Sequence, residues 1–311
     1  MKEAGFGGAS GRTPTRTPKS GYLARKFPEN RTIMKVERVI PMVDSEIGQR
    51  VEEIEEQRDF SFQLVATMLL FLFALGIAER TVYFVDPVQG LFLHAGILVV
   101  LILYVSARWD QSQYRYLLGL SIVPIMRIIS LALPLQYFPL AFWYGLASLV
   151  LSVALLMFAQ RLEFTRLDLG INLKIFPVQF LVGLGGILIG VGHYFILRPS
   201  LPISGATLAQ RTTLGLVFLV CNGFIEELIF RGMLQHIAEK ILDHRLAWLY
   251  VAGMYSILTL GSYSLGSVAF TFVISLFFSW IVSRTGSISG VSLAHGLASI
   301  TLFLIMPGLS L

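Results

Sequence analysis

Long apolar stretches separated by short polar segments form the main pattern of this chain. A membrane-spanning α-helix needs about 20 mostly apolar residues. Nine stretches approach this length, at roughly 60–78, 90–107, 116–135, 139–159, 177–197, 213–235, 246–261, 265–283 and 287–306. The seventh and the last are marginal, and an eight-span alternative merges the last weak segments. The pattern predicts an all-α, polytopic transmembrane helix bundle with eight or nine spans.

Composition and loop charge support this prediction and suggest an orientation. The 311 residues are 55% hydrophobic and 14% charged, whereas a soluble domain carries about 25% charge. Cytoplasmic loops collect Lys and Arg, which predicts a cytoplasmic amino terminus, an external carboxyl terminus and contact with the lipid bilayer. With no organelle signal, we expect a prokaryotic plasma membrane. The predicted internal loops carry Arg108, Arg115, Arg161, Arg166, Lys174, Lys240, Arg245 and Arg284, and the external ones Arg80, Arg198 and Arg211.

The chain before the first span divides by charge. Residues 1–43 are basic and rich in Gly, Ser, Thr and Pro, which predicts a disordered tail. We favour a solvated tail that fixes topology over one that binds anionic lipid, and we expect no nucleic-acid partner. Residues 44–59 are acidic, and Asp44 can cap a short amphipathic helix there. The amino-terminal segment before the first span is a candidate contact for a membrane protein partner. We assign 60–164 to amino-terminal transmembrane helices and 165–311 to a membrane core.

Adjacent carboxylates stand inside the sixth stretch. Glu226 and Glu227 are followed by Arg231. Charge inside a bilayer is costly, so intramembrane glutamates are candidates for function. Glu227 and Arg231 have the favourable i, i+4 spacing of an acid before a base. Their pairing would leave Glu226 free for chemistry. The alternative is a structural polar cluster that packs helices.

Two later spans add polar residues, and together the three segments resemble a known family. The residues are Tyr255-Ser256-Ile257-Leu258-Thr259 and His295-Gly296-Leu297-Ala298-Ser299. With the Glu226–Arg231 segment they resemble the CPBP family of intramembrane proteases, which includes CAAX prenyl endopeptidases of the Rce1 type and the bacterial Abi (bacteriocin self-immunity) proteins. Leu169-Gly170 and Arg284–Ile288 also look like family linkers. The resemblance covers about 165–306.

The resemblance implies roles for these residues and exposes two departures. The family pattern is EExxxR, FxxxH and HxxxN. Glu226, Glu227 and Arg231 match the first part, and His295 begins the third. It implies that Glu226 is a general base on water and His295 its partner in peptide-bond hydrolysis. Tyr255 stands at the Phe position, Thr259 at a His position and Ser299 at the Asn position. Because Thr is no base at neutral pH, activity is expected to be weakened or lost.

The departures leave two functions and the metal question open. One is an endopeptidase that acts on a peptide or prenylated-peptide substrate. The other is a catalytically inactive relative that serves as a membrane scaffold or accessory subunit. A divalent metal such as zinc has been considered for the family. Glu226 and His295 would supply two ligands here, whereas catalytic zinc normally has three protein ligands.

Three further residues are candidates for supporting roles. Arg127 lies within the third span and needs a partner or a watery cavity, so it is either a substrate contact or a structural ion pair. His193 is expected to be a hydrogen-bonded structural group. Asn222, one turn before Glu226, can hydrogen-bond Glu226 or another helix. The spacing of Gly186 and Gly190 predicts close helix packing.

Overall fold

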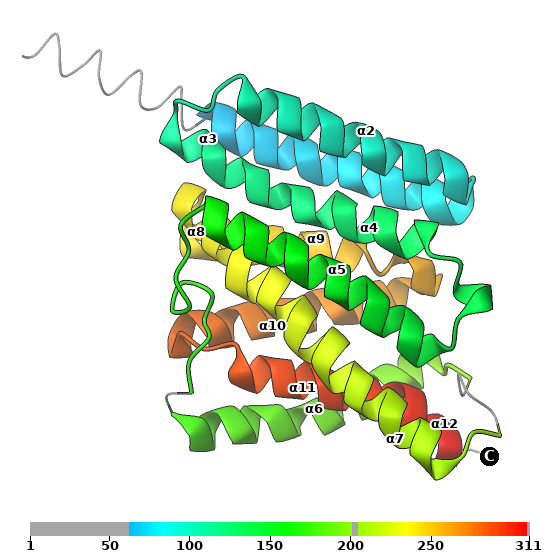
Figure 1. Ribbon diagram of the computed structural model, residues 1–311. Coiled ribbons are helices and arrows are strands. Elements are labelled where there is room, and N and C mark those ends of the chain that lie inside the picture. Colours follow the sequence, from blue (N-terminus) through cyan, green and yellow to red (C-terminus); the bar gives the residue numbers. More distant parts are fainter. Residues whose placement is uncertain (1–61, 174, 201–204, 310–311) are drawn as a thin grey trace, which may run out of the picture. The chain divides into compact units, whose positions relative to one another are not determined.

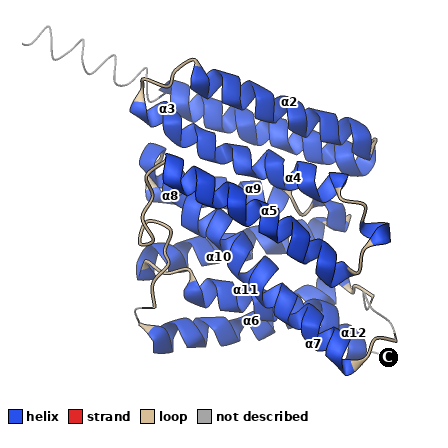
Figure 2. Ribbon diagram, viewed as in Figure 1, coloured by secondary structure: helices blue, strands red, loops and turns tan. Residues whose placement is uncertain are grey.

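The computed structural model describes residues 62–173, 175–200 and 205–309. The predicted tail, 1–43, and the predicted acidic helix, 44–59, lie outside the described residues. Within the described part the chain is helical and contains no strand (Figure 2). This confirms the all-α prediction.

The described chain forms a series of helices with short connections (Figure 1). A first helix runs over Phe62–Phe84. It is followed by α2 (Pro87–Ser106), α3 (Ser112–Leu117), α4 (Ile122–Ala132), α5 (Leu140–Arg161), α6 (Phe176–Leu197), α7 (Leu208–Val217), α8 (Gln235–Ile241), α9 (His244–Ile257), α10 (Leu265–Thr285), α11 (Ser289–Ile300) and α12 (Met306–Leu309). Short 3₁₀ segments lie at Leu118–Ser121, Leu135–Tyr137 and Leu260–Ser262, and π-helical segments at Phe218–Glu226, Leu228–Leu234 and Thr301–Ile305.

Eight helices of the described part are long and apolar enough to cross a membrane. They include one continuous helix, Leu208–Ile241, which we call the motif helix. The seventh predicted stretch corresponds to α9, which has 14 residues and is shorter than a full span. The last two stretches remain separate helices, Leu265–Thr285 and Ser289–Leu309. The eight-span count of the alternative is therefore confirmed for the described residues, but it arises because α9 is too short for a span and not because the last segments merge.

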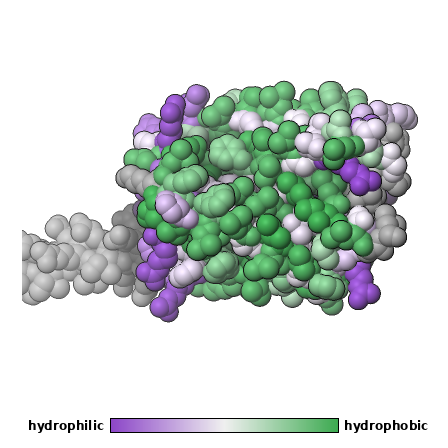
Figure 3. Space-filling model, turned by 90° about the horizontal axis from the view of Figure 1, so that it is seen from below, coloured by the Kyte–Doolittle hydropathy of each residue, from purple (hydrophilic) through white to green (hydrophobic). Residues whose placement is uncertain are grey.

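The surface has the distribution expected of a membrane protein. In the face drawn in Figure 3, hydrophobic residues cover the middle and hydrophilic residues gather at the two ends. Large apolar side chains such as Val100 and Leu188 are 67% and 76% exposed. Apolar groups favour a non-aqueous environment, so this surface fits a bilayer. The chain is thus an integral membrane protein.

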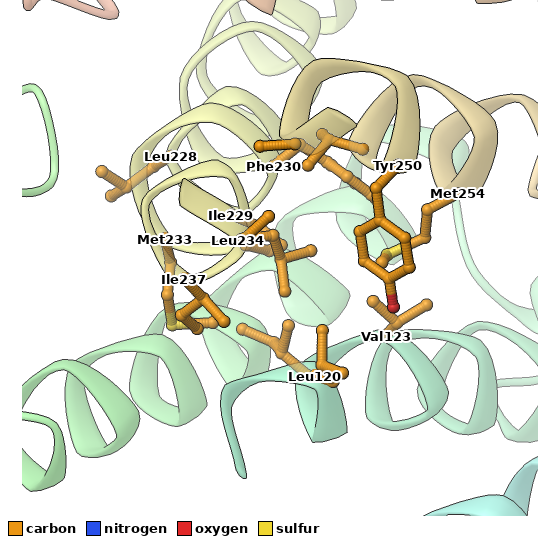
Figure 4. Close-up of a cluster of buried hydrophobic side chains, with 14 of the residues drawn as sticks. Leu120, Val123, Leu228, Ile229, Phe230, Met233, Leu234, Ile237, Tyr250 and Met254 are labelled. Carbon is orange, nitrogen blue, oxygen red and sulfur yellow. The ribbon is translucent and has the colours of Figure 1, made fainter. Parts of the chain in front are cut away.

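The hydrophobic core lies against the second half of the motif helix. Ile229, Phe230 and Met233 are completely buried. They pack in one cluster with Val123 of α4 and Met254 of α9 (Figure 4). Burying side chains of this size stabilises the fold by about 1.5–3 kcal/mol each. The cluster fixes the motif helix and α9 relative to each other, and both helices carry candidate site residues.

Glycines bring α11 close to two other helices. A Cβ atom on Gly186 of α6 would lie 2.0 Å from the carbonyl oxygen of Ala294, and one on Gly190 would lie 2.6 Å from that of Ala298. These contacts agree with the packing predicted from the glycine spacing. On the other side, a Cβ on Gly223 of the motif helix would lie 2.6 Å from the carbonyl oxygen of Ser292. Because both crossings are this close, they fix the position of α11.

The two linkers that looked family-like are neighbours in the structure. The Ile288 amide donates to the Gly170 carbonyl over 3.0 Å, and the Ser287 hydroxyl donates to the Asn172 carbonyl over 2.7 Å. Gly286 ends α10 with a φ of 63°, a left-handed conformation that favours glycine. The loop before α6 is thereby joined to the loop before α11.

Candidate active site

The carboxylate pair lies where the motif helix becomes π-helical. Glu226 ends the π-helical segment Phe218–Glu226, and Glu227 precedes the next one, Leu228–Leu234. The sequence interpretation assumed an ordinary α-helix, and this detail was missed. A π-helix widens the turn and often occurs at functional sites. The two carboxylates nevertheless have different neighbours, as predicted.

Glu227 is a buried carboxylate with two partners. Its Oε1 accepts from Arg231 Nη1 over 3.0 Å, and the two side chains are 0% and 1% exposed. The same oxygen lies 2.8 Å from Nδ1 of His295 on α11. Arg231 also donates to Ser275 Oγ of α10 over 2.8 Å. Glu227 thus neutralises Arg231 and orients His295, and three helices meet at this point.

Glu226 is half-buried and has a different partner. The hydroxyl of Tyr255 on α9 donates to Glu226 Oε2 over 3.0 Å. The same hydroxyl lies 3.2 Å from Nε2 of His295. One phenol oxygen therefore connects the first glutamate to the imidazole. Tyr255 was predicted only as a residue at a motif position, and its hydroxyl contacts were missed because they join residues from three helices.

These groups open onto a cavity of about 530 Å³. The residues that line it include every site candidate named from the sequence: Arg127, His193, Asn222, Glu226, Glu227, Arg231, Tyr255, Thr259, His295 and Ser299. Much of the remaining lining is apolar, with Met126, Trp143, Ile189, Phe270 and Phe278 among its members. All of these candidates thus line one cavity, and the rest of its lining is mostly apolar.

The residues at the departing positions do not replace an imidazole. The Thr259 hydroxyl donates to the Ser256 carbonyl over 2.7 Å, within its own helix end. Ser299 is 6% exposed and lies one turn after His295. His193 Nε2 lies 2.7 Å from Ser267 Oγ, which fits the predicted structural role. Asn222 is 8% exposed, and within the described chain its Oδ1 has no hydrogen-bond partner.

Arg127 has an acidic partner that the sequence interpretation missed. It forms a two-bond ion pair with Glu79, in which Nη2 donates to Oε2 over 2.9 Å and Nε donates to Oε1. Nη2 also donates to the Tyr83 hydroxyl over 2.7 Å. The first predicted span stopped at residue 78, whereas the helix continues to Phe84. The Glu-Arg dipeptide at 79–80 was the available signal. This geometry agrees with the structural ion pair among the two alternatives.

The described residues do not fit a metal centre. Among them, no group of three or more His, Cys, Asp or Glu side chains is arranged to hold an ion. Glu226 and His295 both contact the Tyr255 hydroxyl. His94 is fully buried, and its Nε2 lies 3.1 Å from Glu79 Oε1. A catalytic zinc normally has three protein ligands, and the described residues do not bring three together.

Comparison with protein families agrees with this arrangement. Residues 208–301 match the family model described as type II CAAX prenyl endopeptidase, Rce1-like. This part of the chain is thus similar to Rce1-like proteins. This confirms the predicted resemblance for 208–301, a narrower range than the predicted 165–306. The Rce1-like range holds every candidate from Asn222 to Ser299, but neither Arg127 nor His193. No match was found among curated proteins or among solved structures.

Proposed function

We propose that this protein is an intramembrane endopeptidase in which Glu226 activates a water molecule. The observation that carries the proposal is the different bonding of the two carboxylates. Arg231 and His295 are bonded to Glu227, whereas Glu226 faces the cavity and contacts a hydroxyl. Within the described residues no salt bridge neutralises Glu226. A carboxylate in this state can accept a proton from water.

The proposed reaction is hydrolysis of a peptide bond. Glu226 removes a proton from water, and the resulting hydroxide oxygen bonds to the carbonyl carbon of the substrate. The carbon–nitrogen bond then breaks, and the stored proton moves to the leaving nitrogen. His295, oriented by Glu227, supports this transfer. Proton transfer by a well-placed group contributes about 10²–10⁴-fold in rate.

The lining of the cavity supports an apolar substrate. Aromatic and aliphatic side chains line the cavity beside the polar candidates, among them Trp143, Ile189 and Phe270. Burial of apolar surface would stabilise a bound chain by about 25 cal/mol per Å². A peptide with apolar residues and a prenylated peptide both suit this chemistry. We propose a substrate of this class that enters from the bilayer.

A catalytically inactive scaffold is the second candidate. It is supported by the bond of Thr259 to its own helix end, since His295 is then the one imidazole that the described residues bring into the hydrogen-bonded network of Glu226 and Glu227. In this case the same cavity would bind a membrane protein segment without cleaving it.

The test compares purified wild type with Glu226→Gln in proteoliposomes. Fluorogenic peptide libraries, one plain and one prenylated, are supplied, with the exposed loop variant Glu163→Gln as control. We expect wild type and Glu163→Gln to cleave equally, and Glu226→Gln to lose at least about 10²-fold in turnover. Equal turnover by wild type and Glu226→Gln would contradict the proposal. No turnover by any form would favour the scaffold.

A further inference from the structure

We propose that Tyr255 is a proton-relay residue that couples Glu226 to His295. This inference rests on the proposed function and adds a residue to its site. The resemblance places an apolar Phe at this position, and Phe has no hydroxyl. Here the phenol oxygen lies 3.0 Å from Glu226 Oε2 and 3.2 Å from His295 Nε2. The Tyr255 hydroxyl thus lies between the Glu226 carboxylate and the His295 imidazole.

The positions of the hydrogen atoms follow from donor and acceptor counting. Glu227 Oε1 accepts from Arg231, so it is a carboxylate oxygen and also accepts from His295 Nδ1–H at 2.8 Å. The Nε2 atom of a neutral His295 is then an acceptor. Tyr255 carries one hydroxyl proton but contacts two groups. Both contacts are hydrogen bonds only if a second proton sits on Glu226 or on Nε2.

Two proton arrangements satisfy these bonds. In the first, protonated Glu226 donates to the Tyr255 oxygen, and the Tyr255 hydroxyl donates to Nε2 of His295. In the second, Nε2–H donates to the Tyr255 oxygen, and the hydroxyl donates to the Glu226 carboxylate. They interconvert when one O–H bond breaks at Glu226 as another forms at Tyr255, while the phenol proton bonds to Nε2. No atom other than hydrogen moves.

The relay gives each half of hydrolysis a proton path. When Glu226 takes a proton from water, the shift through Tyr255 stores that positive charge on His295, beside the Glu227 carboxylate. When the peptide carbon–nitrogen bond breaks, the reverse shift returns the proton to Glu226, which passes it to the leaving nitrogen. One water is consumed, one carboxylic acid and one amine form, and the three side chains return to their starting state.

The surroundings hold the phenol in this position. The Arg231 guanidinium lies 4.9 Å from the centre of the Tyr255 ring, in a cation–π contact. The Phe230 ring approaches the same ring edge-on with 4.7 Å between centroids. Both residues belong to the motif helix, which also carries the two carboxylates. The hydroxyl therefore has a fixed distance to Glu226, as a relay requires.

The test replaces Tyr255 by the family's own residue, Phe. Tyr255→Phe removes one oxygen atom and keeps the ring. The matched control is Tyr250→Phe on the same helix, α9, because the Tyr250 hydroxyl has no hydrogen-bond partner in the described structure. We expect Tyr255→Phe to lower kcat by about 10²–10⁴-fold with KM changed less than about threefold. Tyr250→Phe should match wild type. Unchanged or increased kcat in Tyr255→Phe would overturn the relay.

A second measurement separates this inference from the peptidase function. Subtracting the infrared spectrum of Glu226→Gln from that of wild type isolates the carboxyl and carboxylate stretching bands of Glu226. The relay predicts that these bands shift in Tyr255→Phe and not in Tyr250→Phe. If the bands shift but wild type cleaves nothing, the proposed function fails and the proton coupling stands. If wild type cleaves and Tyr255→Phe changes neither bands nor kcat, the relay fails and the function stands.

Discussion

Replacing the carboxylate by an amide should lower the stability of the fold much more at Glu227 than at Glu226. Glu227→Gln removes the negative charge from a pair with Arg231 whose side chains are 0% and 1% exposed. Removing one partner of a buried pair costs about 3–5 kcal/mol, because the remaining charge is left uncompensated. This corresponds to roughly 150- to 5,000-fold in the unfolding equilibrium constant. Glu226→Gln removes a half-buried carboxylate without such a partner, so its stability should change by less than about 1 kcal/mol.

The assay is reversible unfolding in mixed detergent micelles, followed by circular dichroism. The double variant Glu227→Gln/Arg231→Met removes both charges and should recover most of the lost stability, since replacing a buried pair by apolar residues is often neutral. Equal destabilisation by Glu226→Gln and Glu227→Gln would refute the division of roles. So would a double variant no more stable than Glu227→Gln.

Two further variants test the packing of α11 and a loop carboxylate. Gly223→Ala places a methyl group against the α11 backbone and should destabilise by about 1–3 kcal/mol, measured by the same unfolding assay; Gly185→Ala, where a Cβ would meet no atom within 4 Å, should not. Bonds from the Thr165 hydroxyl and amide lower the pKa of the Asp168 carboxyl from its ordinary value of 3.8. The resulting stabilisation is present above this value and is lost as pH falls through the lower, folded pKa. Thr165→Ala should therefore be less stable than wild type at pH 6 and should approach it in more acidic buffer. A stability gap that stays constant across that range would contradict this.

Much of the fold could be predicted because bilayer thickness sets the length of an apolar helix. The stretches at 139–159 and 177–197 lie almost entirely within α5 and α6. The α9 helix was overestimated, since the apolar run continues past Ile257 into a 3₁₀ segment. Hydropathy measures composition, and it does not record where a helix stops. The same limit placed the end of the first span before Glu79.

The candidate site was predictable only in part. Glu226 and Glu227 stood out because charge is rare in an apolar run. The i, i+4 spacing also predicted the pairing of Glu227 with Arg231. The pairing of Arg127 with Glu79, 48 residues away, depends on how two helices pack. The contact of Tyr255 with both Glu226 and His295 requires the relative register of three helices, which local sequence does not encode.

The hydrolysis rate of wild type against Glu226→Gln tests the central claim most directly. Both forms are reconstituted at equal concentration and supplied with the same plain and prenylated peptide libraries, and new amino termini are counted by mass spectrometry. We expect cleavage by wild type and a loss of at least about 10²-fold in Glu226→Gln, with folding unchanged. Cleavage at equal rates by the two forms would contradict it, because the reaction would then not depend on the Glu226 carboxylate.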